Sequence, residues 1–155
     1  MNEFIAKKLG EVLAFERMQE DTLTKGKAAV DRAYGPKEVK AMLIDAKSLK
    51  EGIESIAEES EEWGDTVLKK AEKTGKKIAD MRNVYLSEDD WDDPVEILEW
   101  SGAFEGGALV HWSLVAGGAE AVGLKEASTL AEKGLEAHSS ILNRIKEIIR
   151  KAETL

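Results

Sequence analysis

Residues 124–149 read LKEASTLAEKGLEAHSSILNRIKEII. One side of this segment is predominantly apolar, because its apolar side chains recur every three or four positions, as on one face of an α-helix. That face consists of Leu124, Ala127, Ala131, Leu135, His138, Leu142, Ile145 and Ile149. The segment therefore predicts a long amphipathic helix that carries a histidine, His138, at the centre of its buried face.

The rest of the chain shows the same spacing, and no stretch alternates with the period of two that a strand requires. Both prolines, Pro36 and Pro94, stand where a helix begins. The segment Asp93-Pro94-Val95-Glu96 combines an N-cap residue, a proline and an acidic residue, as helix starts do. We predict four helices, at about 2–33, from 36 onward, at 94–122 and at 124–152.

The second predicted helix is longer than its neighbours, since its apolar stripe runs from Val39 to Ala71. We expect it to overhang or bend, with a break at Gly75, after which residues 76–93 lead back to the third helix. Tight turns at Gly35 and Gly123 indicate two antiparallel helix pairs. The predicted fold is an all-α, antiparallel four-helix bundle in one domain, residues 1–155, with up-down-down-up topology and a long crossover between helices 2 and 3.

Composition and charge exclude several classes of function. The chain has 22 basic and 31 acidic residues, and a net charge of −9 opposes binding to nucleic acid or to an anionic membrane. No apolar run is long enough to span a membrane, and the N-terminal residues lack the apolar core of a signal peptide, so we expect a cytoplasmic protein. Cysteine is absent, which leaves carboxylates and imidazoles as ligands for any metal.

Five polar residues lie on or beside the predicted apolar faces, near the middle of their helices. Glu16 lies at the centre of the first face and His138 at the centre of the last, while Glu54, Glu105 and His111 lie on the shoulders of helices 2 and 3. A buried carboxylate is costly without partners. We therefore predict that these five residues converge as a candidate metal site.

Inward-pointing carboxylates and histidines on a two-plus-two bundle resemble the ferritin-like superfamily, including the rubrerythrins. In that family each helix pair supplies one Glu and one Glu-x-x-His element. By this resemblance Glu16 and Glu105 correspond to the lone carboxylates. The Glu-x-x-His elements are not intact, because Ser60 and Trp63 stand where helix 2 would carry Glu and His, and Leu135 precedes His138 by three residues.

The resemblance implies iron or manganese, with zinc as an alternative, in a mononuclear or dinuclear site that handles oxygen, peroxide or the metal itself. The incomplete motifs imply a degenerate or atypical site. Whether the protein is an enzyme stays open, and no residue is assigned as catalytic.

Two other interpretations fit the same residues. In the first, His138 is a neutral core histidine hydrogen-bonded to Glu16 or Glu105, no metal is bound, and the protein is a non-enzymatic interaction protein that forms a homodimer through the overhanging end of helix 2. In the second, tryptophans and glycines between helices 3 and 4 line a pocket for a small molecule.

Overall fold

Residues 1–151, the part that the computed structural model describes, form helices joined by short turns and contain no strand, so the all-α prediction is confirmed. Five of the helices are long and one is short, and a short 3-10 helix connects α4 to α5. The elements are α1 (Glu3–Lys25), α2 (Lys27–Tyr34), α3 (Pro36–Glu58), α4 (Gly64–Tyr85), η1 (Asp89–Asp92), α5 (Pro94–Ala121) and α6 (Lys125–Lys151).

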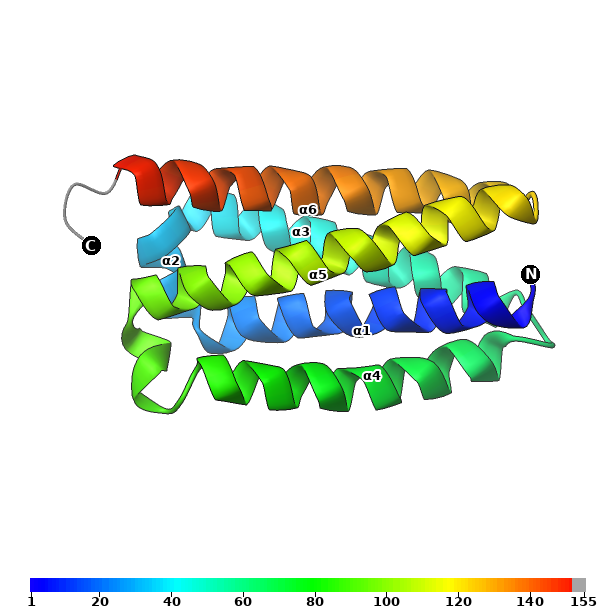
Figure 1. Ribbon diagram of the computed structural model, residues 1–155, viewed down its shortest axis with the longest axis horizontal. Helices are drawn as coiled ribbons and strands as arrows, with labels where there is room; N and C mark the ends of the chain where they lie inside the picture. Colours follow the sequence, from blue (N-terminus) through cyan, green and yellow to red (C-terminus); the bar gives the residue numbers. More distant parts are fainter. Residues whose placement is uncertain (152–155) are drawn as a thin grey trace.

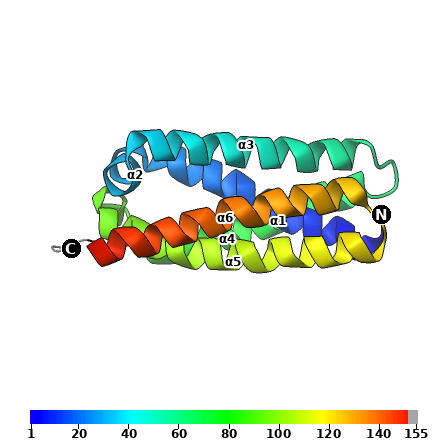
Figure 2. The ribbon, with the colours of Figure 1, turned by 90° about the horizontal axis from the view of Figure 1, so that it is seen from above.

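The long helices lie side by side, and consecutive ones run in opposite directions. In Figure 1, α1, α4 and α6 run toward the left and α3 and α5 toward the right. Helix α1 lies against α3, α4 and α5, and α6 lies against α3 and α5. Figure 2 shows α3 along one side of the molecule and α5 along the other, with α6 passing between them. Helix α4 packs mainly against α1.

The first predicted helix is in fact two helices, α1 and α2, that meet at Gly26. The ring of Trp91, from η1, lies directly on this glycine, and a Cβ atom there would be only 3.0 Å from the ring. The break therefore lets the connection between α4 and α5 pack closely against the end of α1.

The second predicted helix breaks at residues 59–63, and the break predicted at Gly75 is wrong. Gly75 lies inside α4, where an added Cβ would meet no atom within 4 Å. Helix α3 ends in the acidic run that starts at Glu58, and negative charge at a helix C-terminus opposes the helix dipole. At Gly64 a Cβ would lie 2.4 Å from the carbonyl oxygen of Ala57, so this reversal requires glycine. The second half of the predicted helix consequently folds back along α1 as α4, and within residues 1–151 no overhanging end is present.

The predicted helix start and tight turns are confirmed. The Asp93 side chain accepts a hydrogen bond from the Val95 backbone N–H, and Pro94 occupies the first turn of α5. Gly35 and Gly123 have positive φ angles of 91° and 67°, which favour glycine.

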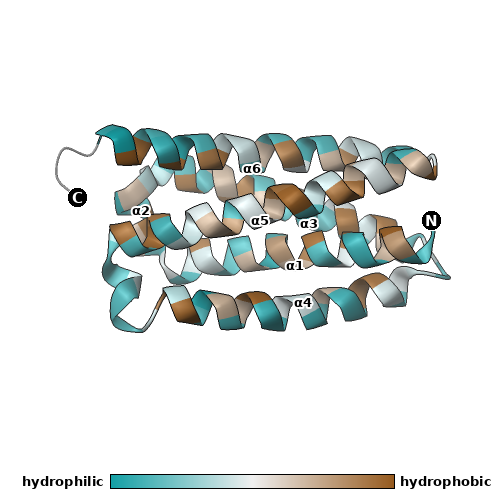
Figure 3. Cartoon of the chain, in the orientation of Figure 1, coloured by the Kyte–Doolittle hydropathy of each residue, from teal (hydrophilic) through white to brown (hydrophobic). Residues whose placement is uncertain are grey.

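The core consists of two apolar clusters, one at each end of the long helices, and Figure 3 shows the corresponding apolar bands on the inner sides of the helices. One cluster contains Tyr34, Trp100 and Phe104, and the other contains Ile53 and Trp112. Along α6 the polar residue His138 lies between the two clusters. No helix in the described part of the chain is long and apolar enough to cross a membrane.

Candidate functional site

Three charged or titratable side chains meet between the two apolar clusters, each from a different helix. Glu16 comes from α1, Glu105 from α5 and His138 from α6, and their exposed fractions are 1%, 0% and 1%. Glu16 and His138 occupy positions in the apolar stripes of their helices, so burial of each stripe carries the polar group inward, and Glu105 follows the buried residue Phe104 on α5. The predicted convergence of these three residues is confirmed.

The imidazole ring of His138 bridges the two carboxylates. Its Nδ1 lies 2.5 Å from Glu105 Oε2, and its Nε2 lies 2.8 Å from Glu16 Oε1. A neutral imidazole carries one N–H and could donate only one of these bonds, whereas the imidazolium form donates both. The distances fit an imidazolium that donates both bonds, whereas a neutral ring would donate one bond and accept the other from a protonated carboxyl group.

Two further buried side chains complete the network. The indole N–H of Trp112 donates to Glu16 Oε1 at 2.9 Å, and the Gln19 amide donates to Glu105 Oε1 at 2.9 Å. Helical spacing places both donors at the network. Gln19 follows Glu16 by three residues on α1, and Trp112 follows Glu105 by seven residues on α5. Each donor therefore lies on the same side of its helix as one carboxylate and bonds to the other carboxylate across the helix interface. Both carboxylates are thereby bound by more than one donor, as buried charged groups require.

Gly134 makes the contact between α5 and α6 possible. A Cβ atom at this position would lie 2.5 Å from the ring of Trp112. The ring thus occupies the space that a side chain would fill one turn before His138. The small-molecule pocket predicted between the tryptophans and glycines of the last two helices is wrong at this place, since the indole itself fills it.

Burial and charge act in opposite directions on His138. Burial lowers its pKa, but the hydrogen bonds and charges of Glu105 and Glu16 outweigh burial and raise the pKa from 6.5 to about 10. Burial raises the pKa of Glu105, and the hydrogen bond from His138 opposes that rise. The raised pKa favours the imidazolium form of His138 at neutral pH over the neutral core histidine predicted from the sequence.

The stability of the fold should fall as the pH rises from about 6.5 to about 10. A group whose pKa is raised on folding contributes stability below its unfolded pKa and loses that contribution as the pH rises through its folded pKa. For His138 the two limits are 6.5 and about 10. At ~1.4 kcal/mol per pKa unit, the loss has an upper bound of about 5 kcal/mol.

This pH dependence can be measured by urea unfolding at closely spaced pH values. The matched control is His138→Leu combined with Glu16→Gln and Glu105→Gln, which removes all three titrating groups, so the decline specific to this pH interval should be absent. Equal slopes for the two proteins between pH 6.5 and 9.5 would contradict the assignment of an imidazolium.

Glu54 and His111 do not join the other three predicted residues. Glu54 lies at the surface of α3 and pairs with Arg17 of α1 at 2.8 Å. His111 lies with its Nδ1 2.9 Å from Oε2 of Glu11, a carboxylate that Lys8 and Lys70 also contact. The predicted five-residue site is therefore a buried cluster of three residues, a separate ion pair between Glu54 and Arg17, and a separate contact between His111 and Glu11.

These residues do not fit a metal centre in this geometry. Both ring nitrogens of His138 face carboxylate oxygens, and a nitrogen must be free of a proton to bind a metal. In residues 1–151 no group of three or more histidine or carboxylate side chains is arranged to hold a metal ion. The ligand set implied by the incomplete Glu-x-x-His elements is thus not assembled.

Space beside the network is small but connects to a groove. A cavity of about 10 Å³ adjoins Glu16, Gln19 and His138, which is room for about one water molecule. A groove of about 370 Å³ between α3 and α6 shares Leu49 and Ala137 with this cavity. The network is therefore dry except on the side that faces α3.

Trp112 belongs to the network but is not among the five candidate residues predicted from the sequence. Its indole is fully buried, with an exposed fraction of 0%, and a buried indole N–H needs an acceptor. Two signals were present: its spacing of seven residues from Glu105, and a glycine four residues before His138.

Comparisons with known proteins yield no match to this chain: no family model, no curated protein and no solved structure is matched.

Proposed function

We propose that this protein is a non-catalytic interaction protein, in which the network of Glu16, Glu105 and His138 is a structural ion-pair centre. The observation that carries this proposal is the engagement of both ring nitrogens of His138 by carboxylates. A group that must accept or deliver protons, or bind a ligand, needs an available position. Here the carboxylates are also held by Trp112 and Gln19, so the network is built to be satisfied internally.

The same geometry supports a relationship to ferritin-like bundles without their metal. The neighbours α1, α3, α6 and α5 form a closed ring, and α4 connects α3 to α5 from outside that ring. We interpret the ring as a four-helix bundle with up-down-down-up topology and α4 as its crossover. In this interpretation the imidazolium lies where a bundle of that family would hold a cation between carboxylates.

The proposal is tested by thermal melting of metal-free protein with and without added Fe²⁺, Mn²⁺ or Zn²⁺. We expect the same melting temperature in every case. A metal bound specifically to the folded state would add about 2.7 kcal/mol at a concentration one hundred times its Kd, which melting detects readily.

Elemental analysis of untagged protein completes this test, with Glu54→Gln as a matched carboxylate variant outside the network. Stoichiometric metal that is retained in Glu54→Gln and lost in His138→Leu would overturn the proposal and assign the three buried residues as metal ligands.

A further inference from the structure

The excess of acidic over basic residues lies in one part of the chain. Residues 83–124 contain nine acidic residues and neither lysine nor arginine. The other 22 acidic residues and the 22 basic residues cancel, so the net charge of −9 belongs entirely to this segment. Such a concentration creates a field of one sign at a defined place on the surface.

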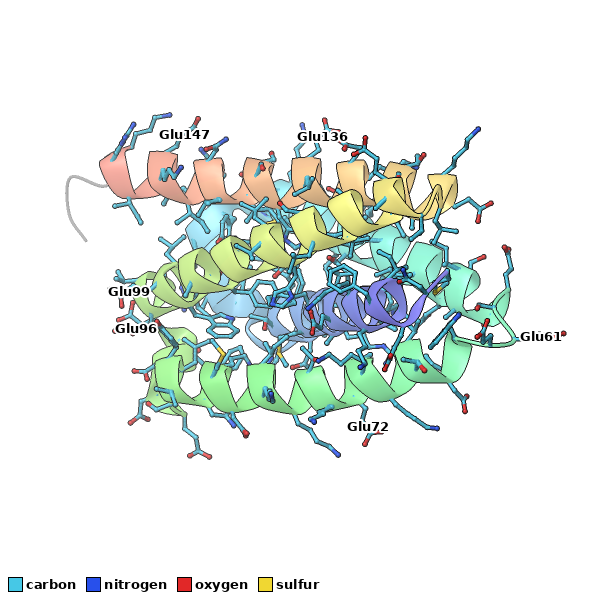
Figure 4. The ribbon with its side chains drawn as sticks, turned by 45° about the vertical axis from the view of Figure 1, so that its right-hand side comes forward. Glu61, Glu72, Glu96, Glu99, Glu136 and Glu147 are labelled. Carbon is cyan, nitrogen blue, oxygen red and sulfur yellow. The ribbon has the colours of Figure 1, made fainter. Side chains whose placement is uncertain are left out.

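Seven of the nine carboxylates lie at the end of the molecule where α4 leads into α5. They are Glu88, Asp89, Asp90, Asp92, Asp93, Glu96 and Glu99. Figure 4 shows Glu96 and Glu99 side by side at the start of α5, pointing away from the protein. Among the described residues, none of the seven forms a side-chain ion pair within 4.0 Å, the limit for such a pair.

These carboxylates crowd one another. Burial and the charges of Glu99, Asp90 and Asp93 all raise the pKa of Glu96. Three basic side chains lie at this end. Lys25 and Arg82 lie over the Trp91 ring at 4.6 and 5.1 Å, Arg82 also pairs with Asp21, and Arg32 donates to the Asp92 carbonyl oxygen at 2.6 Å. The carboxylates outnumber these basic groups, so this end of the protein carries an excess of negative charge.

Apolar side chains are exposed at the same end. Met81, Val84 and Tyr85, on the last two turns of α4, have exposed fractions of 55%, 84% and 41%. The Tyr85 ring lies 5.8 Å from that of Trp100, which fixes the end of α4 beside the first turns of α5. The three residues, which we call the α4 apolar surface, thus lie beside the first turns of α5, whose Glu96 and Glu99, together with the acidic residues of η1, we call the acidic border.

We propose that the α4 apolar surface and its acidic border bind a lysine- or arginine-rich amphipathic segment of a partner protein. This inference rests on the proposed interaction function and names the chemistry of its partner. The apolar side chains of the segment would cover Met81, Val84 and Tyr85, while its basic side chains would pair with the acidic border. Charge complementarity selects this occupant, because nucleic acid, an anionic membrane or the same acidic end of a second copy of this chain would bring negative charge to negative charge.

The test uses the full chain and two synthetic peptides of equal length. One is an amphipathic helix of leucine and lysine, and the other has every lysine replaced by glutamate. Binding is followed by fluorescence anisotropy of the labelled peptide at several salt concentrations. We expect the lysine peptide to bind with an affinity that falls as salt increases, and the glutamate peptide not to bind.

Two variants separate the apolar and the charged contributions. Met81→Ser with Val84→Ser removes exposed apolar side chains, and Glu96→Gln with Glu99→Gln removes exposed charge. Each pair should weaken binding of the lysine peptide at least tenfold. Ile44→Ser is the matched control, since Ile44 is similarly exposed, at 58%, but lies on α3; this variant should bind as the unmodified protein does.

The inference is overturned if the lysine peptide does not bind, or if the Met81 and Val84 variant binds it as tightly as the unmodified protein. The second result would mean unspecific attraction between charges. Neither of these results changes the expected outcome of the metal measurements. Conversely, stoichiometric metal at His138 would reject the structural ion-pair centre but would leave peptide binding at the α4 apolar surface unaffected.

Discussion

Replacing His138 with leucine lowers the free energy of unfolding by about 3 to 5 kcal/mol at pH 7, the usual cost of removing one partner from a buried ion pair. The substitution leaves Glu16 and Glu105 in a site where their exposed fractions are 1% and 0%. Each carboxylate must then stay charged without its cation or take up a proton. The loss should shrink toward pH 5, because protonated carboxyl groups are much cheaper to bury than carboxylates.

A compensating variant distinguishes this effect from lost packing. Glu16→Gln and Glu105→Gln, added to His138→Leu, remove both buried charges, and each amide oxygen can still accept the N–H of Trp112 or Gln19. We expect chemical denaturation to show a recovery of at least about 2 kcal/mol at pH 7. The ion-pair assignment would be contradicted if His138→Leu lowered the free energy of unfolding by less than about 1 kcal/mol. It would also be contradicted if the triple variant were no more stable than His138→Leu.

Replacing Gly10 with alanine should separate α1 from α4. A Cβ atom at this position would lie 2.5 Å from the carbonyl oxygen of Val67 and 2.7 Å from Lys70 Cβ. Neither atom is the end of a flexible side chain, so one helix must shift along its whole contact. We expect a loss of about 3 kcal/mol, as in other overpacked cores, and a fall in melting temperature of about 6 to 12 °C for a chain of this size.

Gly75→Ala is the matched control, because Gly75 lies inside the same helix α4 and a Cβ there meets nothing within 4 Å. Alanine should stabilise the protein by about 0.5 to 1 kcal/mol by reducing the conformational freedom of the unfolded chain. Thermal melting of the two variants shows whether α1 and α4 pack closely at Gly10. Equal shifts for Gly10→Ala and Gly75→Ala would mean that α4 does not pack on α1 as described.

The fold class and several boundaries follow from local sequence signals. Three-and-four spacing identifies helices, and the cap at Asp93 and the turns at Gly35 and Gly123 depend on a few adjacent residues. The breaks at Gly26 and at residues 59–63 depend on distant contacts. Trp91 must pack on Gly26, and the Ala57 carbonyl must approach Gly64, before either break can be recognised. A continuous apolar stripe cannot show that its second half folds back.

The candidate site was predictable to a similar degree. Helical phase places Glu16 and His138 inward, and the turn at Gly123 brings Glu105 to the height of His138. Phase could not place Glu54 and His111, because a shoulder position faces either the interior or a neighbouring surface charge. Arg17 and Glu11 decide the outcome for these two residues. Protonation of His138 likewise depends on two carboxylates from other helices.

The position of α1 against α3, α4 and α5 shapes how the chain can fold during its synthesis. This helix leaves the ribosome before all of its packing partners, and its last major partner ends at Ala121. At roughly 5 to 20 residues per second, about 5 to 20 seconds separate the completion of α1 from that of α5. Helices α3 and α4 are synthesised within this interval and can cover part of α1, but the face of α1 that contacts α5 stays without its partner until the end. Docking of α5 and α6 closes the ion-pair centre last.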